Sequence, residues 1–130
     1  MTSGARRLTL SGLTVLLVED ELLIAMDIEA ALEDRGATVR GPIMRLSDGV
    51  PLAENEDEHF DVAILDINLR GEEVYPIAER LKLRGVPFLF HTGHGEEDIL
   101  KARFGEIPVC NKPVRTERLV DEVERLLAIS

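Results

Sequence analysis

Val62, Ala63, Ile64 and Leu65 form a short, uninterrupted apolar run that ends at Asp66. Such a run, with no alternating polar residues, is typical of a strand covered on both faces in a parallel sheet. In open α/β sheets, ligands bind beyond the carboxyl ends of the strands, which is where Asp66 would lie. Aspartate is also a common turn former, so a turn-capping role is the alternative. The run therefore predicts a parallel sheet and makes Asp66 a candidate functional residue.

Other short apolar stretches recur along the chain, and segments rich in helix-forming residues separate them. The expected strands cover residues 14–18, 38–41, 62–65, 86–90 and 107–110. The expected helices cover residues 22–35, 74–83 and 96–104, a short segment from 47 that Pro51 interrupts, and a last segment from 116 almost to residue 130. This alternation predicts a doubly wound α/β fold with a parallel sheet in the order 2-1-3-4-5. Residues 70–73 are expected to form a loop, and Pro42 to follow the second strand.

Size, charge and cysteine content narrow the classes of function. The 130 residues suit one domain, and their 45% apolar content is enough for a core. A formal net charge of −10 argues against binding to nucleic acid or to an anionic membrane surface. Cys110 has no partner for a disulfide, and no apolar run approaches the ~18 residues of a membrane span, so we expect a cytoplasmic protein. Residues 1–12 lack the apolar core of a signal peptide and are expected to be a polar lead-in.

Residues with functional side chains follow four of the five expected strands. Glu19 and Asp20 follow the first, Asp66 the third, Thr92 the fourth and Lys112 the fifth. Because the carboxyl ends of parallel strands share one edge of the sheet, we expect these residues to converge. A single acid near the start of the next helix would suit the helix dipole, but three consecutive acids exceed what a cap needs. A solvated lysine and a strand-end hydroxyl are the alternative interpretations of Lys112 and Thr92.

Convergent carboxylates have a definite chemical consequence. Their repulsion raises the pKa of at least one of them unless a cation enters, and Mg²⁺ is the hard divalent ion that suits such oxygen ligands. A carboxylate such as Asp66 can also act as a nucleophile and form an aspartyl phosphate. Lys112, the Thr92 hydroxyl and the backbone N–H groups of Gly93 and His94 are then candidate donors to the phosphoryl oxygens.

This set of residues resembles the receiver domain of bacterial two-component response regulators, from about residue 13 to residue 129. The matching features are the acidic pair Glu19-Asp20, Asp66 in Leu-Asp-Ile-Asn-Leu, Thr92 in Thr-Gly-His, and Lys112 in Lys-Pro. The resemblance implies a flavodoxin-like (βα)5 fold. It also implies an N-terminal lead-in at 1–12, a receiver domain at 13–130 and no output domain, as in a single-domain regulator.

The resemblance implies a role for each acid. Asp66 would be the phosphoacceptor. Asp20, Asp66 and the backbone carbonyl of Asn68 would bind Mg²⁺, with Mn²⁺ as an alternative ion, and Glu19 would act through a bound water.

It also implies how the phosphoryl group would be held. Thr92 and Gly93 would contact the group and form part of the switch, and Lys112 would pair with it. The Lys112-Pro113 peptide bond is expected to be cis. His94, two residues after Thr92, would tune hydrolysis of the phosphoaspartate, or is simply an exposed loop histidine.

The chain departs from the common pattern near these residues. Many relatives carry Tyr or Phe three residues before the lysine as a switch residue, but Val109 is found here. Residues 90–95 resemble the Phe-Ala-Thr-Gly-rich motif of a sub-family, mostly stand-alone receivers, that also lacks the aromatic residue. The sub-family's tyrosine after the glycines is Gly95 here. His91 would either be packed at the strand end, which we favour, or belong to a substitute switch.

The expected function is that of a single-domain response regulator. A sensor histidine kinase or a phosphotransfer protein would phosphorylate Asp66, and an altered interface would signal to a downstream protein. We expect a monomer, or a weak phosphorylation-dependent dimer, with self-phosphorylation and self-dephosphorylation chemistry but no separate enzymatic activity. The alternative is a non-phosphorylated, receiver-like interaction module. An aspartyl-phosphate phosphatase would need an acid where Asn68 stands, and no Gly-rich loop follows the first strand to bind a nucleotide or flavin.

Overall fold

The computed structural model describes residues 8–93 and 96–128. Its main sheet has five parallel strands in the order β2-β1-β3-β6-β7. The elements, in chain order, are β1 Thr14–Val18, α1 Leu22–Asp34, β2 Thr38–Ile43, α2 Leu46–Glu54, β3 Val62–Leu65, β4 Asn68–Leu69, β5 Glu72–Glu73, α3 Tyr75–Leu83, β6 Phe88–Thr92, α4 Glu97–Phe104, β7 Val109–Asn111 and α5 Thr116–Leu126. The main-sheet order is the predicted 2-1-3-4-5, so the predicted doubly wound, flavodoxin-like fold is confirmed.

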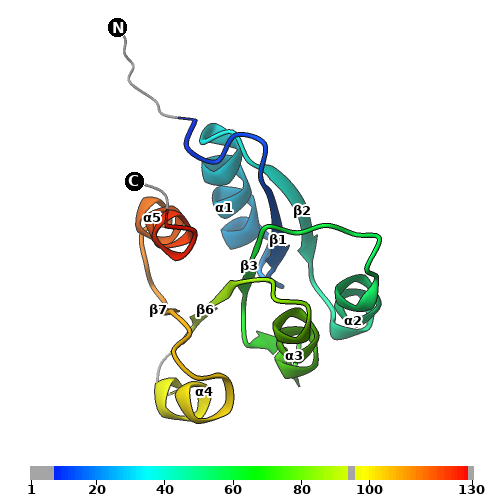
Figure 1. Cartoon of the computed structure of the whole chain (residues 1–130). Helices are drawn as coiled ribbons and strands as arrows, with labels where there is room; N and C mark the ends of the chain where they lie inside the picture. The colour runs from blue at the N-terminus through cyan, green and yellow to red at the C-terminus, as the bar shows by residue number, and fades with distance from the viewer. Residues whose placement is uncertain (1–7, 94–95, 129–130) are drawn as a thin grey trace, which may run out of the picture.

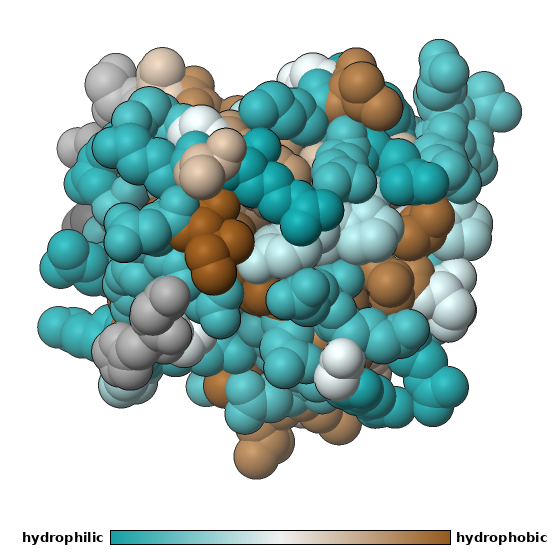
Figure 2. Space-filling view, turned by 90° about the horizontal axis from the view of Figure 1, so that it is seen from below, coloured by the Kyte–Doolittle hydropathy of each residue, from teal (hydrophilic) through white to brown (hydrophobic). Residues whose placement is uncertain are grey.

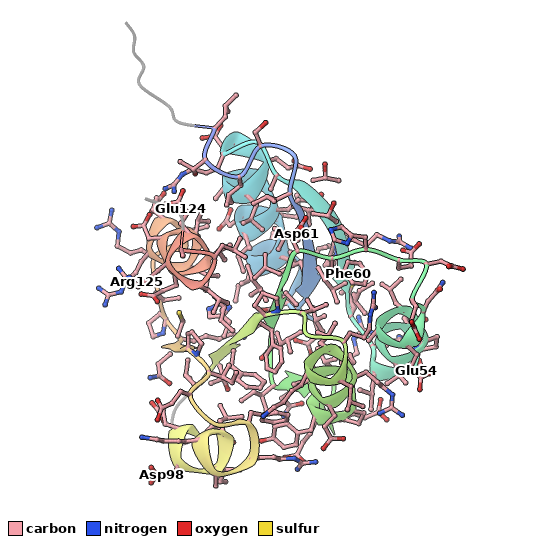
Figure 3. All side chains as sticks on the ribbon, in the orientation of Figure 1. Glu54, Phe60, Asp61, Asp98, Glu124 and Arg125 are labelled. Carbon is pink, nitrogen blue, oxygen red and sulfur yellow. The ribbon has the colours of Figure 1, made fainter. Side chains whose placement is uncertain are left out.

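Helices cover both faces of the sheet: α1 and α5 lie on one side, and α2, α3 and α4 on the other (Figure 1). This arrangement explains why β3 is apolar throughout. Ala63 and Leu65 belong to the core on the α2–α4 side, whereas Val62 and Ile64 belong to the core on the α1–α5 side. Side chains from both layers fill the space against the sheet (Figure 3). No helix in the described part of the chain is long and apolar enough to cross a membrane.

A cluster of aromatic rings joins the fourth main strand to its neighbouring helices. Ring contacts connect Phe88 and Phe90 of β6 to Phe104 of α4, and Phe104 in turn to Tyr75 of α3. Arg103 lies over the Tyr75 ring at 4.4 Å from its centroid. Burial of each ring contributes about 1.5–3 kcal/mol. The cluster therefore anchors the last turn of α4 against β6 and α3.

The two prolines that were expected to limit regular structure lie inside it. Strand β2 continues through Pro42, and α2 continues through Pro51 to Glu54, so the expected early ends were wrong. Pro42 is tolerated because β2 is an edge strand with an irregular register at this point. Helix α2 is held by its packing on α3. A Cβ atom on the buried Gly49 would lie 2.3 Å from Ile77 Cδ1, so the two helices approach closely there.

The segment expected to be a loop at residues 70–73 is part of a small antiparallel hairpin, β4–β5. Arg70 and Gly71 form its two-residue turn with φ angles of 53° and 90°. Positive φ at both positions is the geometry of a type I′ hairpin turn, which glycine favours and arginine rarely adopts. The Asn68 side-chain oxygen accepts a 2.8 Å hydrogen bond from the Gly71 N–H, and Leu69 is fully buried. The hairpin is thereby anchored immediately after the β3 end.

Candidate functional site

The register of β1 with β3 brings two acids together. Val18 is paired with Leu65, so the residues that follow them, Glu19 and Asp66, leave adjacent strands at the same level. The Asp66 N–H donates a 2.9 Å hydrogen bond to the Val18 carbonyl. Glu19 is 1% exposed and Asp66 5% exposed, so both carboxyl groups are buried. Parallel pairing alone therefore places two acids side by side beneath the surface.

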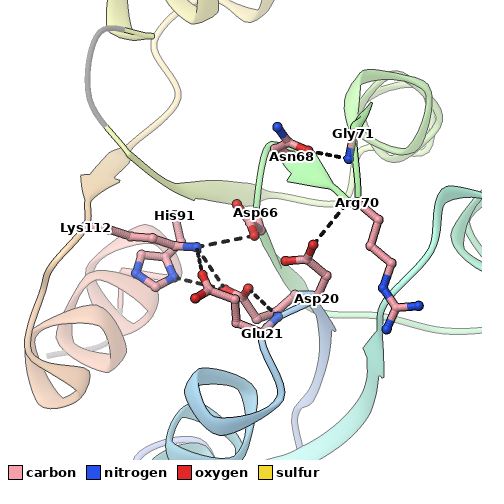
Figure 4. A network of polar contacts seen from close by, with 9 residues as sticks. Asp20, Glu21, Asp66, Asn68, Arg70, Gly71, His91 and Lys112 are labelled. Carbon is pink, nitrogen blue, oxygen red and sulfur yellow. Dashed lines mark hydrogen bonds and ion pairs between the residues drawn. The ribbon is translucent and has the colours of Figure 1, made fainter.

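Two further acids complete this group, which we call the acidic cluster: Glu19, Asp20, Glu21 and Asp66. One carboxylate oxygen from each lies within 4.8 Å of the others. The cluster is at the carboxyl edge of the sheet (Figure 4). Figure 2 shows the molecule from the side to which the strands run, and hydrophilic residues dominate this face. The structure thus brings together the acids singled out in the sequence and includes Glu21, the last of the three consecutive acids after the first strand.

Lys112 extends from the end of β7 into the acidic cluster. Its Nζ atom lies 3.3 Å from Asp66 Oδ2, 3.4 Å from Glu19 Oε1 and 3.1 Å from Glu21 Oε2. Burial alone would lower the pKa of Lys112, but the charges of Asp66 and Glu19 outweigh it and raise that pKa. The lysine is therefore a fixed positive charge. The peptide bond between Lys112 and Pro113 is cis, as expected.

The two buried acids differ in their affinity for a proton. Burial, assisted by the charge of Glu19, raises the pKa of Asp66 to about 7, although Lys112 opposes this. Burial also raises the pKa of Glu19, but contacts with His91, the Glu21 backbone N–H, Asp66 and Lys112 reverse the effect and lower it to about 2. Near neutral pH, the cluster therefore holds more negative charge than Lys112 can balance. An excess of oxygen ligands with unbalanced charge fits a hard divalent cation such as Mg²⁺.

The β4–β5 hairpin holds Asp20, an acid of the cluster that is less buried than Glu19 and Asp66. Asp20 Oδ2 accepts a 2.9 Å hydrogen bond from the Arg70 N–H, which links the end of β1 to the β4–β5 turn (Figure 4). Asn68 begins β4, two residues beyond Asp66, and its side chain is engaged with Gly71. The role expected for its backbone carbonyl stays a prediction. The hairpin, which we had not predicted, is what positions both residues.

Thr92 occupies the last position of β6 and is 5% exposed. Its carbonyl accepts a 2.5 Å hydrogen bond from the Lys112 N–H, which ties the ends of β6 and β7 together. Gly93 follows, and a Cβ atom there would meet nothing within 4 Å. His94, the expected tuning residue, lies outside the described residues. The structure therefore places Thr92 and Gly93 at the same sheet edge as Lys112.

Two residues of β6 and β7, His91 and Val109, set this site apart from the common pattern described above. Val109 begins β7 and is paired with Phe90, so an aliphatic side chain stands where a switch aromatic is common. His91 is packed, as we favoured, at 4% exposure. Sequence reasoning missed that its Nδ1 atom lies 3.7 Å from Glu19 Oε1. The alternation of side chains along the strand could have indicated that His91 is buried toward the acids, because it sets His91 on the same side of the sheet as the buried Leu89.

Comparison with known proteins identifies the family. The model of the response regulator receiver domain matches residues 15–124. The chain belongs to this family. The receiver domain is thus a component of two-component signal transduction, as predicted, whereas membership of the Phe-Ala-Thr-Gly-rich sub-family stays a prediction. None of the curated proteins compared with the chain matches it.

Solved structures agree with this assignment. SdrG from Sphingomonas melonis Fr1 is 41% identical, with 92% of this chain and 98% of that chain covered and a TM-score of 0.71. A CheY-like receiver domain protein from Methanospirillum hungatei JF-1 is 26% identical over 89% of this chain and 94% of that chain, with a TM-score of 0.76. The HemR receiver domain from Leptospira biflexa shares the fold at 24% identity, covering 91% of this chain and 96% of that chain, with a TM-score of 0.76.

Proposed function

We propose that this receiver domain accepts a phosphoryl group on Asp66 from a sensor histidine kinase or a phosphotransfer protein, in a Mg²⁺-dependent reaction. The observation that carries the proposal is the position of the Asp66 carboxylate. It lies within 4.8 Å of the carboxylates of Glu19 and Asp20 and 3.3 Å from Lys112 Nζ. One nucleophilic oxygen is thus surrounded by ligands for a cation and by a fixed positive charge. Family membership supports the same assignment.

The proposed ligands for Mg²⁺ are Asp20, Asp66 and the backbone carbonyl of Asn68, with Glu19 acting through a water molecule. Mn²⁺ offers the same oxygen-binding chemistry as an alternative. The cation supplies charge neutralisation for the carboxylates and for the incoming phosphoryl oxygens. The dense negative charge of the acidic cluster and the raised pKa of Asp66 both suit this role.

The transfer itself is a nucleophilic substitution at phosphorus. A carboxylate oxygen of ionised Asp66 forms the new bond to phosphorus. The bond from phosphorus to the donor's imidazole nitrogen breaks, and its electron pair leaves with that nitrogen. Lys112, the Thr92 hydroxyl and the Gly93 N–H are proposed to hold the three phosphoryl oxygens. Attack by water on the phosphoaspartate would reverse the modification, so the domain would need no separate enzymatic activity.

The proposed output is an altered protein–protein interface. The Lys112 N–H donates a hydrogen bond to the Thr92 carbonyl, so a change at either residue would affect the ends of both β6 and β7. With Val109 in β7, rotation of an aromatic residue cannot carry the signal at that position. The net charge of −10 favours a protein partner over nucleic acid. We place this reaction in the cytoplasm and expect a monomer before phosphorylation.

A phosphate-affinity gel tests the proposal. The purified protein is incubated with acetyl phosphate and Mg²⁺, and matched samples contain a chelator or carry Asp66→Asn or Asp57→Asn. Asp57 lies in an exposed loop and serves as the control aspartate. We expect a retarded band for wild type and Asp57→Asn, and none with the chelator or with Asp66→Asn. If folded wild type shows no band with acetyl phosphate or a kinase donor, the constitutive interaction module becomes the better account.

A further inference from the structure

His91 lies between Glu19 of the acidic cluster and a neighbouring cavity, which Glu21 of the cluster also lines. The cavity has a volume of about 440 Å³, and Ile24 and Ile28 of α1, Leu119 of α5, Lys112 and His91 contribute to its lining. The His91 side chain is 6% exposed, and its ring points toward the acidic cluster (Figure 4). An imidazole in this position cannot obtain its hydrogen bonds from bulk water on the cluster side.

Two buried polar atoms face each other where His91 meets Glu19. Among the described residues, Glu19 Oε1 and His91 Nδ1 are both buried without a hydrogen-bond partner, and they lie 3.7 Å apart. The other oxygen of Glu19 is occupied, because Oε2 accepts a 3.0 Å hydrogen bond from the Glu21 N–H. Glu19 Oε1 also lies 3.4 Å from Lys112 Nζ, an ion-pair contact rather than a hydrogen bond. Because a buried polar atom without a hydrogen bond is unfavourable, each of the two atoms has reason to satisfy the other. A movement of less than one ångström would bring them to hydrogen-bond distance.

We propose that His91 is a positioning residue, whose Nδ1–H donates to Glu19 Oε1 and fixes the orientation of that carboxylate. The proposal requires the imidazole tautomer of His91 that carries its proton on Nδ1. It does not require His91 to change its charge. Its consequence for Mg²⁺ rests on the function proposed above, in which Glu19 reaches the cation through water. Outer partners of this kind orient metal-binding groups and commonly change metal affinity when they are removed.

The need for a second donor follows from the position of Lys112. Its Nζ atom is shared among Glu19, Glu21 and Asp66. Once Lys112 turns toward a phosphoryl group, Glu19 Oε1 loses its nearest cation. His91 belongs to a central strand of the sheet and does not depend on the phosphoryl group, so it would keep the carboxylate oriented in both states.

The low pKa of Glu19 agrees with a donor in this position. Burial raises the pKa of Glu19, and the contact with His91 is the strongest of the effects that lower it to about 2. Glu19 is thus held in its ionised form, which is the form that accepts hydrogen bonds from both His91 and a metal-bound water.

Two substitutions at His91 separate positioning from simple packing. His91→Ala removes the donor, whereas His91→Asn places an amide N–H close to the position of Nδ1. Mg²⁺ binding is measured by isothermal titration calorimetry. We expect roughly 10-fold weaker binding for His91→Ala, and near wild-type affinity for His91→Asn. His59→Ala, which removes an exposed histidine, is the matched control and should bind as wild type does.

Nitrogen NMR of the imidazole in the metal-free wild type gives an independent result. We expect the proton on Nδ1, and a proton on Nε2 alone would overturn the proposal. Wild-type Mg²⁺ affinity in folded His91→Ala, or no recovery in His91→Asn, would also overturn it. If the wild type binds no Mg²⁺, the proposed metal chemistry fails, while the imidazole spectrum still decides whether His91 holds Glu19.

Discussion

Lys112 Nζ lies 3.3 Å from Asp66 Oδ2, so a lysine from the end of β7 is already paired with the carboxylate at the end of β3. The two residues are 46 positions apart in the sequence (112 − 66) and are joined by the parallel packing of β3, β6 and β7. Lys112 is the one cation that touches all the buried acids of the cluster within the described residues. The stability of the metal-free protein should therefore depend on it.

Replacing Lys112 with methionine tests this dependence. We expect Lys112→Met to lower the free energy of unfolding by about 1–2 kcal/mol at pH 8, because the acids lose their nearby positive charge. The loss should be smaller at pH 5, where Asp66 carries a proton. Urea denaturation at both pH values measures the change. Lys101→Met, which removes an exposed surface pair with Glu106, is the control and should have little effect. Equal losses for the two variants at pH 8 would contradict the account.

Asp66 should make the stability of the metal-free protein depend on pH. Its pKa is raised from 3.8 to about 7 in the folded state, so the folded protein binds a proton there that the unfolded chain has released. The free energy of unfolding should therefore fall as pH rises from about 4 to about 7, and then level off. Asp66→Asn should abolish this fall and be about 2–4 kcal/mol more stable than wild type at pH 8. Parallel urea titrations of the two proteins in a chelator would reveal the opposite slope if the account is wrong.

Binding of Mg²⁺ should offset the loss of folding stability that repulsion among the crowded carboxylates causes. At a concentration about 100-fold above its dissociation constant, Mg²⁺ should stabilise the wild type by ~2.7 kcal/mol, because only the folded chain brings the ligands together. Thermal unfolding with and without Mg²⁺ measures this effect. Asp20→Asn should lose most of the stabilisation, and Asp57→Asn should keep it. An equal response from all three proteins would show that the ion acts elsewhere.

The β4–β5 turn should matter for both stability and metal binding. Gly71 has a φ of +90° with free space around its Cβ position, so Gly71→Ala adds backbone strain of about 1–2 kcal/mol without a clash. The strained turn would also displace the Arg70 N–H from Asp20, and Mg²⁺ binding should weaken.

Gly85 is the matched control for this turn. It has a φ of +74°, equally free space, and a position at the end of α3. Gly85→Ala should cost a similar free energy of unfolding but leave the Mg²⁺ affinity measured by calorimetry unchanged. If both variants bind Mg²⁺ as wild type does, the hairpin does not position Asp20.

The sheet and the convergence of the acidic residues were predictable because both depend on simple rules. Continuous apolar runs indicate strands covered on both faces, and parallel strands bring the residues that follow them to one edge. The position of Asp66 beside Glu19 follows directly from the pairing of Val18 with Leu65.

The missed features depend on contacts that local patterns do not contain. Arg70 adopts a left-handed conformation that its residue type disfavours, because the hairpin closes around Asn68 and the buried Leu69. Pro51 stays within α2 because packing of Gly49 against Ile77 holds that helix. In each case tertiary packing outweighs the local preference.

The most direct test of the central claim is the intact mass of the protein after reaction with acetyl phosphate and Mg²⁺. We predict that wild type gains the mass of one phosphoryl group, that a chelator prevents the gain, and that Asp66→Asn shows none while remaining folded. A phosphoryl group on folded Asp66→Asn, or an unmodified wild type with both acetyl phosphate and a kinase donor, would contradict the assignment of Asp66 as the phosphoacceptor.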